Sequence, residues 1–171
     1  MKMKKIAVTG AKGCIGQRLV SLGTTPLSCD VTSREQVVES LDFAKPNVVI
    51  HCAAISSADE CEKDYEKAIS VNVYGTNIVC EEAERAGVKV VLLSTDQIFD
   101  GKEGEYREDD IPDPVHAYGH SKLGAEAVAQ LYDAKILRIS RCFDSQSRDI
   151  SEYLLRLENN IEIEVPYCIY R

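Results

Sequence analysis

Short apolar runs alternate with amphipathic stretches along most of the chain. The apolar runs are rich in β-branched residues and predict buried strands at residues 6–9, 25–30, 47–51, 89–94 and 135–140. Amphipathic stretches between them predict helices at residues 15–22, 33–44, 59–65, 68–86 and 118–132. This alternation is typical of a mostly parallel sheet with helices on both faces.

The last part of the sequence continues the pattern. Residues 150–157 predict an amphipathic helix, and residues 161–165 alternate apolar and acidic side chains as an edge strand with one wet face would. No repeat, low-complexity tract or linker divides the chain. We therefore expect residues 1–171 to form a single α/β domain, a Rossmann-like three-layer αβα sandwich. Its mostly parallel sheet should have about six strands.

The composition narrows the classes of partner. The chain has 171 residues, of which 44% are hydrophobic and 28% charged, as in soluble globular domains. Its formal net charge of −8 argues against nucleic acid and against a membrane surface as the partner. The basic start leads into a strand and not into a signal-peptide core, and no apolar run approaches membrane-spanning length. We therefore expect a cytoplasmic protein.

The cysteines and histidines predict neither disulfides nor a metal site. The seven cysteines are an odd number without a C-x-x-C pair, which favours reduced thiols. Cys14, Cys52 and Cys80 lie in apolar runs and are expected to be buried. The histidines show no ligand spacing with the cysteines. Asp59 and Glu62 are predicted to lie on a solvated helical face.

A glycine-rich turn joins the first predicted strand to the first predicted helix. Its sequence, Gly10-Ala-Lys-Gly-Cys-Ile-Gly16, has the spacing G-x-x-G-x-x-G. Glycines permit a tight turn and let a diphosphate approach the amides at a helix N-terminus. In this context the turn favours dinucleotide binding over a purely structural role. The residues expected at the cofactor are Gly10, Lys12, Gly13, Cys14, Ile15 and Gly16.

Small and hydroxyl-bearing residues follow two other predicted strands. Cys52, Ala53 and Ala54 come directly after the strand at residues 47–51, and small side chains there let a ligand approach the backbone. Ser94 and Thr95 come at the end of the strand at residues 89–94. Because ligands of parallel sheets bind at the carboxyl ends of the strands, we expect all of these residues at one edge.

Tyr118 and Lys122 lie four residues apart at the start of a predicted helix, so they share one face. An ammonium beside a phenol stabilises the phenolate and lowers the pKa of the tyrosine. Such a tyrosine can act as a general acid toward a carbonyl oxygen. The alternative is an ordinary surface pair, and Thr95 upstream in the right order favours the catalytic interpretation.

Taken together, these motifs resemble the extended short-chain dehydrogenase/reductase superfamily, and within it the dTDP-4-dehydrorhamnose reductase (RmlD-like) branch. The matching segments lie in family order at residues 9–16, 30–32, 46–54, 71–76, 94–101 and 118–126. The resemblance implies that Thr95 polarises a substrate carbonyl, that Tyr118 donates the proton, and that Lys122 lowers the pKa of the tyrosine and holds the nicotinamide ribose. It also implies that Gly10, Gly13 and Gly16 line the cofactor diphosphate.

The resemblance further implies a cofactor and a substrate. Asp30 and Val31 match the family's adenine contact, and the cofactor is NADP or NAD. Lys12 and Arg34 slightly favour NADPH, since a cationic side chain suits a 2′-phosphate. The implied substrate is a 4-keto nucleotide sugar, and a homo-oligomer is plausible for this superfamily. Asn72 either supports the backbone or contacts the cofactor.

Two departures keep other functions open. Asp30 follows Gly16 by 14 residues, fewer than the spacing of about 20 at which a dinucleotide fold places its ribose-binding acid. The family's C-terminal substrate domain is expected to be absent or truncated, which favours a non-catalytic dinucleotide-binding or regulatory module as the alternative. A nucleotide-sugar dehydratase or epimerase ranks lower, since Gln97 cannot ionise where dehydratases of this type carry a glutamate.

Overall fold

Five parallel strands form one sheet in the order β2-β1-β3-β4-β5. The computed structural model describes residues 5–140, so the helix and strand predicted at 150–157 and 161–165 lie outside the described residues. The strands are β1 (Ile6–Thr9), β2 (Thr25–Pro26), β3 (Val48–His51), β4 (Lys89–Thr95) and β5 (Lys135–Ile139). Their parallel pairing confirms the predicted Rossmann-like α/β fold.

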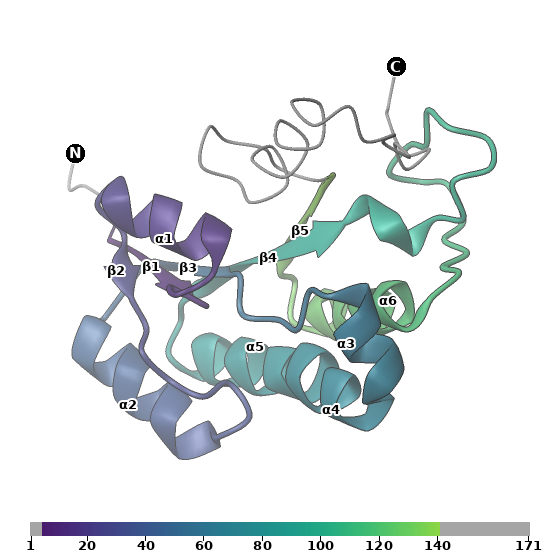
Figure 1. The fold of residues 1–171 in the computed structure, drawn as a ribbon. Coiled ribbons are helices and arrows are strands. Elements are labelled where there is room, and N and C mark those ends of the chain that lie inside the picture. The colour runs from purple at the N-terminus through teal and green to yellow at the C-terminus, as the bar shows by residue number, and fades with distance from the viewer. Residues whose placement is uncertain (1–4, 141–171) are drawn as a thin grey trace, which may run out of the picture.

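Helices cover both faces of this sheet, as Figure 1 shows. The helix α1 lies on one face, and α2, α5 and α6 lie on the other. The α-helices are α1 (Cys14–Ser21), α2 (Arg34–Ala44), α3 (Ala58–Lys63), α4 (Tyr65–Ile69), α5 (Gly75–Arg85) and α6 (Ala117–Leu131). Among the described residues, no helix is both long and apolar enough to cross a membrane.

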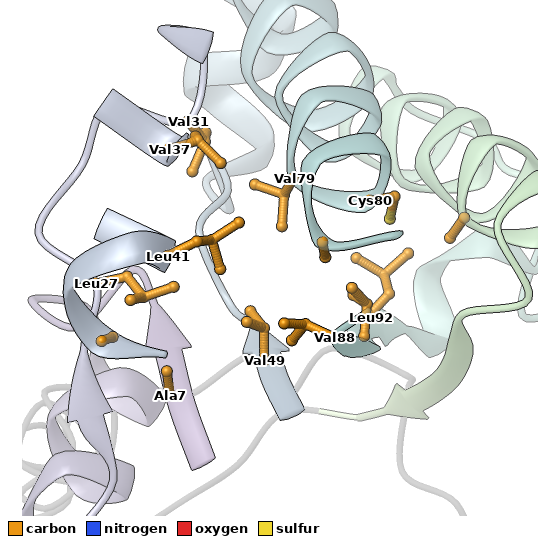
Figure 2. Close-up of a cluster of buried hydrophobic side chains, with 14 of the residues drawn as sticks. Ala7, Leu27, Val31, Val37, Leu41, Val49, Val79, Cys80, Val88 and Leu92 are labelled. Carbon is orange, nitrogen blue, oxygen red and sulfur yellow. The ribbon is translucent and has the colours of Figure 1, made fainter. Parts of the chain in front are cut away.

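The main core lies between the sheet and the helices α2, α5 and α6 (Figure 2). Strand residues Ala7, Val49 and Leu92 face this layer and are at most 1% exposed. Helical residues such as Val37 and Val79 pack against them. Burying a side chain of this size stabilises the fold by roughly 1.5–3 kcal/mol. The apolar runs at 6–9, 47–51 and 89–94 form the central strands β1, β3 and β4, whose two faces are covered by helices.

The strand predicted at residues 25–30 is much shorter than expected. Only Thr25 and Pro26 pair with β1, and one further bond runs from Leu27 N to Val8 O at 2.8 Å. Proline has no N–H to donate, which suits it to the edge of a sheet. The chain then turns at Asp30, whose N–H donates to the Gln36 side chain at 2.9 Å.

The helix α2 begins where it was predicted, and its start carries one of the two hydrogen bonds of a capping box. The Ser33 side chain accepts a hydrogen bond from Gln36 N and caps the helix. The Gln36 side chain does not return to the Ser33 N–H, as a full capping box requires, because it accepts from Asp30 N. The bond between Asp30 and Gln36 therefore closes the turn between β2 and α2.

The single helix predicted at residues 68–86 is interrupted. A π-helical segment, η1 (Ser70–Tyr74), lies between α4 and α5. It contains Asn72, whose buried amide bonds two neighbouring segments. Inserted turns of this kind often occur at functional sites.

The prediction of free thiols is confirmed for the five described cysteines, but their predicted burial is only partly right. Cys61 and Cys80 are buried, while Cys29 and Cys52 are partly buried. Cys14 is exposed, contrary to expectation, because it opens α1 next to the glycine turn and not inside the apolar run. Cys142 and Cys168 lie outside the described residues.

Candidate functional site

The glycine turn is held tightly against the end of β3. Gly10 has a φ of 66°, and a Cβ atom at this position would lie 2.6 Å from the backbone nitrogen of Ala53. A Cβ atom on Gly16 would overlap the carbonyl of Gly10. Both positions therefore require glycine, one for its conformation and both for the space. The turn predicted from the spacing is confirmed as a close approach of two backbone segments.

The helix α1 begins at this turn with its first amides facing the edge of the sheet. Gly13 is the N-cap and provides no side chain to bond the first turn. The N–H groups of Cys14, Ile15 and Gly16 thus belong to the unpaired first-turn donors of a helix. Such donors, together with the helix dipole, favour an anion.

Two cationic side chains were expected near the adenosine end, and the structure separates them. Lys12 is exposed in the glycine turn, and its backbone carbonyl accepts from the Gln17 side chain at 2.7 Å. The Arg34 guanidinium instead bonds Glu81 at 2.6 Å and also bonds Glu82, both on α5. The expectation that Arg34 favours a 2′-phosphate was wrong, because its charge is already paired.

Asp30 and Val31, the expected adenine contact, lie in the turn after β2. The exposed Asp30 carboxylate accepts bonds from the Thr32 backbone and hydroxyl at 2.9 and 2.7 Å. These bonds hold the pKa of Asp30 below its usual value. Val31 as a whole residue is 4% exposed and packs against Gly75, so it belongs to the core and offers little surface to a ligand.

A chain of buried hydrogen bonds starts at the end of β1. Thr9 Oγ1 accepts from the N–H groups of Cys52 and Ala53 at 3.2 Å each and lies 2.7 Å from His51 Nδ1. His51 Nε2 lies 3.1 Å from Thr76 Oγ1, and Thr76 donates to the Asn72 carbonyl. Since the Thr76 proton is used there, His51 Nε2–H donates to Thr76, and Nδ1 accepts from Thr9. Burial lowers the pKa of His51 to about 3, which keeps this tautomer neutral.

Asn72 extends the same network to α6. Its Oδ1 accepts from Ile55 N at 2.8 Å, and its Nδ2 donates to Ile55 O and to Ser121 Oγ at 3.0 and 2.8 Å. Ser121 in turn donates to the Tyr118 carbonyl at 2.8 Å. The Asn72 side chain is 1% exposed. The structure thus shows Asn72 supporting the backbone, which is one of the two roles predicted for it.

Thr95 and Tyr118 meet where β4 ends and α6 begins. Tyr118 is 9% exposed, and its ring packs with Cys61 and Ala68. Burial raises the pKa of Tyr118, and a hydrogen bond with the Thr95 side chain opposes that rise. Thr95 Oγ1 also lies 3.1 Å from Asp96 Oδ1.

The position of Lys122 corrects a sequence expectation. Its Nζ donates to the backbone carbonyl of Leu93 at 2.7 Å, and the side chain is buried. Lys122 is not one of the described groups that shift the pKa of Tyr118. That pKa is raised and not lowered. Burial lowers the pKa of Lys122 to about 8, while Glu126 raises it. The two residues share a helix face as predicted, but the ammonium faces β4.

The sequence interpretation missed two polar residues beside this pair, Glu126 and Arg138. Glu126 is 1% exposed and accepts a hydrogen bond from Ser94 Oγ. Arg138 on β5 donates to the same carboxylate, with Nη2 at 2.8 Å. The spacing could have indicated Glu126, because it lies one turn after Lys122 on the same face.

Two further features border the site. A cavity of about 270 Å³ lies beside the ends of β4 and β5, lined by Asp96, Phe99, Tyr106, Arg107, Glu108, Arg138, Ile139 and Ser140.

Glu62, predicted as part of a solvated face, accepts from the N–H of Ala117 at 2.7 Å and so binds the start of α6. Asp59 is exposed as expected. Within residues 5–140, no group of three or more His, Cys, Asp or Glu side chains is arranged to hold a metal ion.

Comparison with known proteins identifies the sequence family of this fold. The model of the RmlD substrate binding domain matches residues 3–165. A dTDP-4-dehydrorhamnose reductase of Aggregatibacter actinomycetemcomitans is 35% identical over an alignment of 174 positions, which covers 94% of this chain and 59% of the relative. The methionine adenosyltransferase 2 subunit beta of Danio rerio is 32% identical over an alignment of 139 positions, which covers 72% of this chain and 42% of that protein.

Solved structures agree with this assignment. The crystal structure of dTDP-4-dehydrorhamnose reductase from Bacillus anthracis, in complex with NADP, superposes with a TM-score of 0.84 at 28% identity. The superposition covers 95% of this chain and 62% of that protein. The chain therefore spans about three fifths of the length of the reductases that it matches.

Proposed function

The chain belongs to the RmlD substrate binding domain family, and from this premise we propose that it is an NAD(P)H-dependent reductase of a 4-keto nucleotide sugar. One observation carries the proposal: Thr95 and Tyr118 meet at the carboxyl end of β4, with Lys122 one turn along α6. Ligands of parallel sheets bind at this edge. The similarity to proteins named dTDP-4-dehydrorhamnose reductase supports the same substrate class.

Reduction of a ketone requires a hydride at carbon and a proton at oxygen. A bound reduced nicotinamide supplies the hydride. Tyr118 donates the proton to the oxygen as negative charge develops on it, and the Thr95 hydroxyl donates a hydrogen bond to the same oxygen. For this, Thr95 turns its proton from Asp96 toward the substrate. The product is a secondary alcohol, and the Tyr118 phenolate regains a proton from solvent.

The electrostatics of the site suit an acid that is protonated before the reaction. Burial raises the pKa of Tyr118, so its hydroxyl carries its proton at neutral pH. The phenolate that forms is stabilised by the hydrogen bond with the Thr95 side chain, which lowers the pKa of Tyr118 against the effect of burial. Lys122 lies on the same helix face with its ammonium bonded to Leu93 O.

The cofactor is proposed to bind along the glycine turn. Its diphosphate is assigned to the first amides of α1, next to Gly10, Gly13 and Gly16. The small residues Cys52, Ala53 and Ala54 are assigned to the cofactor because they lie beside the turn, and the exposed Asp30 is assigned to the adenine. We favour NADPH, because Lys12 is exposed at the turn and the Bacillus anthracis reductase holds NADP. Arg34 is not part of this preference, since its charge is paired.

Substrate binding is assigned to the side of the site beyond Thr95. The cavity at the ends of β4 and β5 begins at Asp96, the next residue along the chain. Among its lining residues, the Phe99 and Tyr106 rings can pack on a sugar and Arg107 can bind a phosphate. The proposal also includes a single dinucleotide-binding domain, a cytoplasmic location and a homo-oligomer, without nucleic acid as a partner.

A second function is favoured by one comparison. The chain is also similar to a protein named as a subunit of methionine adenosyltransferase, whose name describes no reductase. A non-catalytic dinucleotide-binding module is therefore the alternative. It would retain the glycine turn and bind NADP without turnover. A nucleotide-sugar epimerase or dehydratase remains third, because Gln97 cannot serve as an ionisable acid or base.

The test uses purified protein with NADPH that carries deuterium on the transferred position. If the protein is a reductase, the product should be heavier than the ketone by one deuterium and one hydrogen. The NADPH should be oxidised to NADP in the same reaction. Calorimetry with NADP and NAD is done in parallel. Dinucleotide binding with no product from any 4-keto nucleotide sugar would instead identify the non-catalytic module.

A further inference from the structure

Glu126 is a buried carboxylate that the proposed reaction does not use. It lies on α6 four residues after Lys122 and eight after Tyr118, so the three side chains form one stripe along the helix. Its exposed fraction is 1%. A charge buried this deeply is costly unless its partners are well placed.

Two residues on neighbouring strands bind this carboxylate. Ser94 and Arg138 are directly paired across β4 and β5, so their side chains share a face of the sheet. The Ser94 hydroxyl donates to Glu126, and Arg138 donates through Nη2 at 2.8 Å and through Nε at 3.1 Å. One helix residue thereby fixes α6 against both strands.

Arg138 extends the contact to the segment that leaves β4. Its Nη1 donates to the backbone carbonyl of Glu108 at 3.0 Å, and its guanidinium lies 5.4 Å from the centre of the Phe99 ring. Phe99 stacks on Tyr106 with ring centres 4.4 Å apart. These residues line the cavity next to Asp96. The Glu126–Arg138 pair therefore joins the helix of Tyr118 to the wall of that cavity.

Stability alone is a weak reason for such a pair. Replacing a buried ion pair by apolar side chains is often neutral or stabilising, because desolvation offsets the attraction. A buried pair that orients other groups has a clearer function. Here the neighbouring groups are three successive residues of β4. Leu93 contacts Lys122, Ser94 contacts Glu126, and Thr95 contacts Tyr118.

We propose that Glu126 is a positioning residue of the site, which holds α6 over β4 and keeps a negative charge one helical turn from Lys122. The proposal rests on the proposed reductase function. It assigns Glu126 no contact with the substrate, and its effect passes through Lys122 and through Ser94.

The charged and titratable groups near Lys122 come from several elements. On α6 they are Tyr118 and Glu126; His51 ends β3, and Cys52 follows it. Asp96, after β4, acts on Tyr118. Burial lowers the pKa of Lys122, and Glu126 is the first of the groups that oppose this. Loss of the Glu126 charge should therefore favour the neutral amine.

The test follows the Lys122 ammonium directly. Protein with carbon-13 at every lysine Cε is titrated by NMR, and the Lys122 signal is identified by its absence from the Lys122→Met variant. Glu126→Gln keeps the shape and removes the charge. The midpoint of the Lys122 titration should move to lower pH by roughly one unit, as expected for loss of a nearby opposite charge. The alkaline limb of turnover should move with it.

Two matched variants separate this effect from a general loss of stability. Glu82→Gln removes another buried carboxylate that binds arginines, on α5, and should leave the Lys122 midpoint in place. Ser94→Ala removes only the hydroxyl contact and should also leave the midpoint in place. Should Glu126→Gln fail to fold, the double variant E126Q/R138Q is titrated, with the same downward shift expected.

An unchanged Lys122 midpoint in Glu126→Gln, or in the double variant, would overturn the proposal. An equal shift in Glu82→Gln would overturn it as well, since the effect would then be global. If the wild-type protein has no turnover, the reductase function fails. The NMR titration does not depend on turnover and still decides the role of Glu126.

Discussion

The ammonium of Lys122 donates a hydrogen bond to the backbone carbonyl of Leu93, at 2.7 Å. This bond places a buried positive charge under the last residues of β4, two positions before Thr95. Burial lowers the pKa of Lys122 to about 8, so holding the charge there is unfavourable for folding. A residue kept at such a cost is expected to serve the reaction and not the stability of the fold.

Replacing Lys122 by Met should therefore stabilise the protein at pH 7. The native pKa of about 8 lies below the 10.5 of a free lysine, so the unfolded chain binds this proton more tightly. The penalty is complete below pH 8 and disappears as the pH rises to 10.5. It amounts to about 3 kcal/mol. After a loss of about 1 kcal/mol for the unpaired Leu93 carbonyl, the net gain should be about 2 kcal/mol.

Urea unfolding at several pH values measures this effect. The wild type should become more stable between pH 8 and 10.5 relative to Lys122→Met. Lys89→Met is the control, because Lys89 is an exposed lysine at the start of β4. A Lys122→Met variant that is less stable than the wild type at pH 7 would contradict the account.

His51 makes a contribution of the same sign in a lower pH range. Burial lowers its pKa from 6.5 to about 3, so the unfolded chain takes up a proton between these values and the native protein does not. The stability that depends on neutral His51 is complete above pH 6.5 and is lost as the pH falls toward 3. The loss should reach about 5 kcal/mol.

The free energy of unfolding of His51→Gln should be lower than that of the wild type at pH 7 and should fall less as the pH decreases. At pH 7 it should lose about 1–3 kcal/mol, since the bonds to Thr9 and Thr76 are not fully replaced. Its stability should then depend less on pH between 3 and 6.5 than that of the wild type. Exposed His120 provides the control, and equal slopes for His51→Gln and His120→Gln would refute a buried neutral imidazole.

The glycine turn allows a test of steric fit. Gly10→Ala would add a Cβ atom 2.6 Å from Ala53 N at a φ of 66° and should cost more than Gly87→Ala, which has a similar φ of 68° and open space around it. Gly87→Ala should lose only the conformational term of about 1 kcal/mol. Gly10→Ala should also weaken NADP binding by about tenfold or more, equal to about 1.4 kcal/mol. Calorimetry and thermal unfolding measure both effects, and equal costs in the two variants would argue against a tight turn.

Most of the fold could be predicted from the sequence, because its signals are local. The runs at 47–51 and 89–94 became β3 and β4, since nearly continuous apolar residues suit a strand covered on both faces. The glycine spacing indicated a close backbone contact, which Gly10 and Ala53 now show. The residues predicted at 150–157 and 161–165 lie outside the described part of the chain.

The remaining features depend on contacts between distant segments. The π-helical segment η1 follows from bonds of Asn72 to Ile55 and Ser121, which lie 17 and 49 positions away. The spacing of Tyr118 and Lys122 gave their shared helix face but not the partner of the ammonium. That partner is a backbone carbonyl on β4, which no side-chain pattern reveals.

The central claim is that the Tyr118 hydroxyl donates the proton in a reductase reaction. Tyr118→Phe removes that hydroxyl and keeps the ring in its pocket with Cys61 and Ala68. Tyr132→Phe is the matched control, because its hydroxyl also makes a partly buried hydrogen bond, to Asn77 on α5 at 3.1 Å. Turnover of a 4-keto nucleotide sugar with NADPH is measured for the three proteins, together with NADPH binding by calorimetry.

The account predicts that Tyr118→Phe loses about 10²–10⁴-fold in turnover, the range for a general acid. Its NADPH affinity should equal that of the wild type, and Tyr132→Phe should retain full turnover. Turnover by Tyr118→Phe at the wild-type rate would contradict the assignment of Tyr118 as the proton donor.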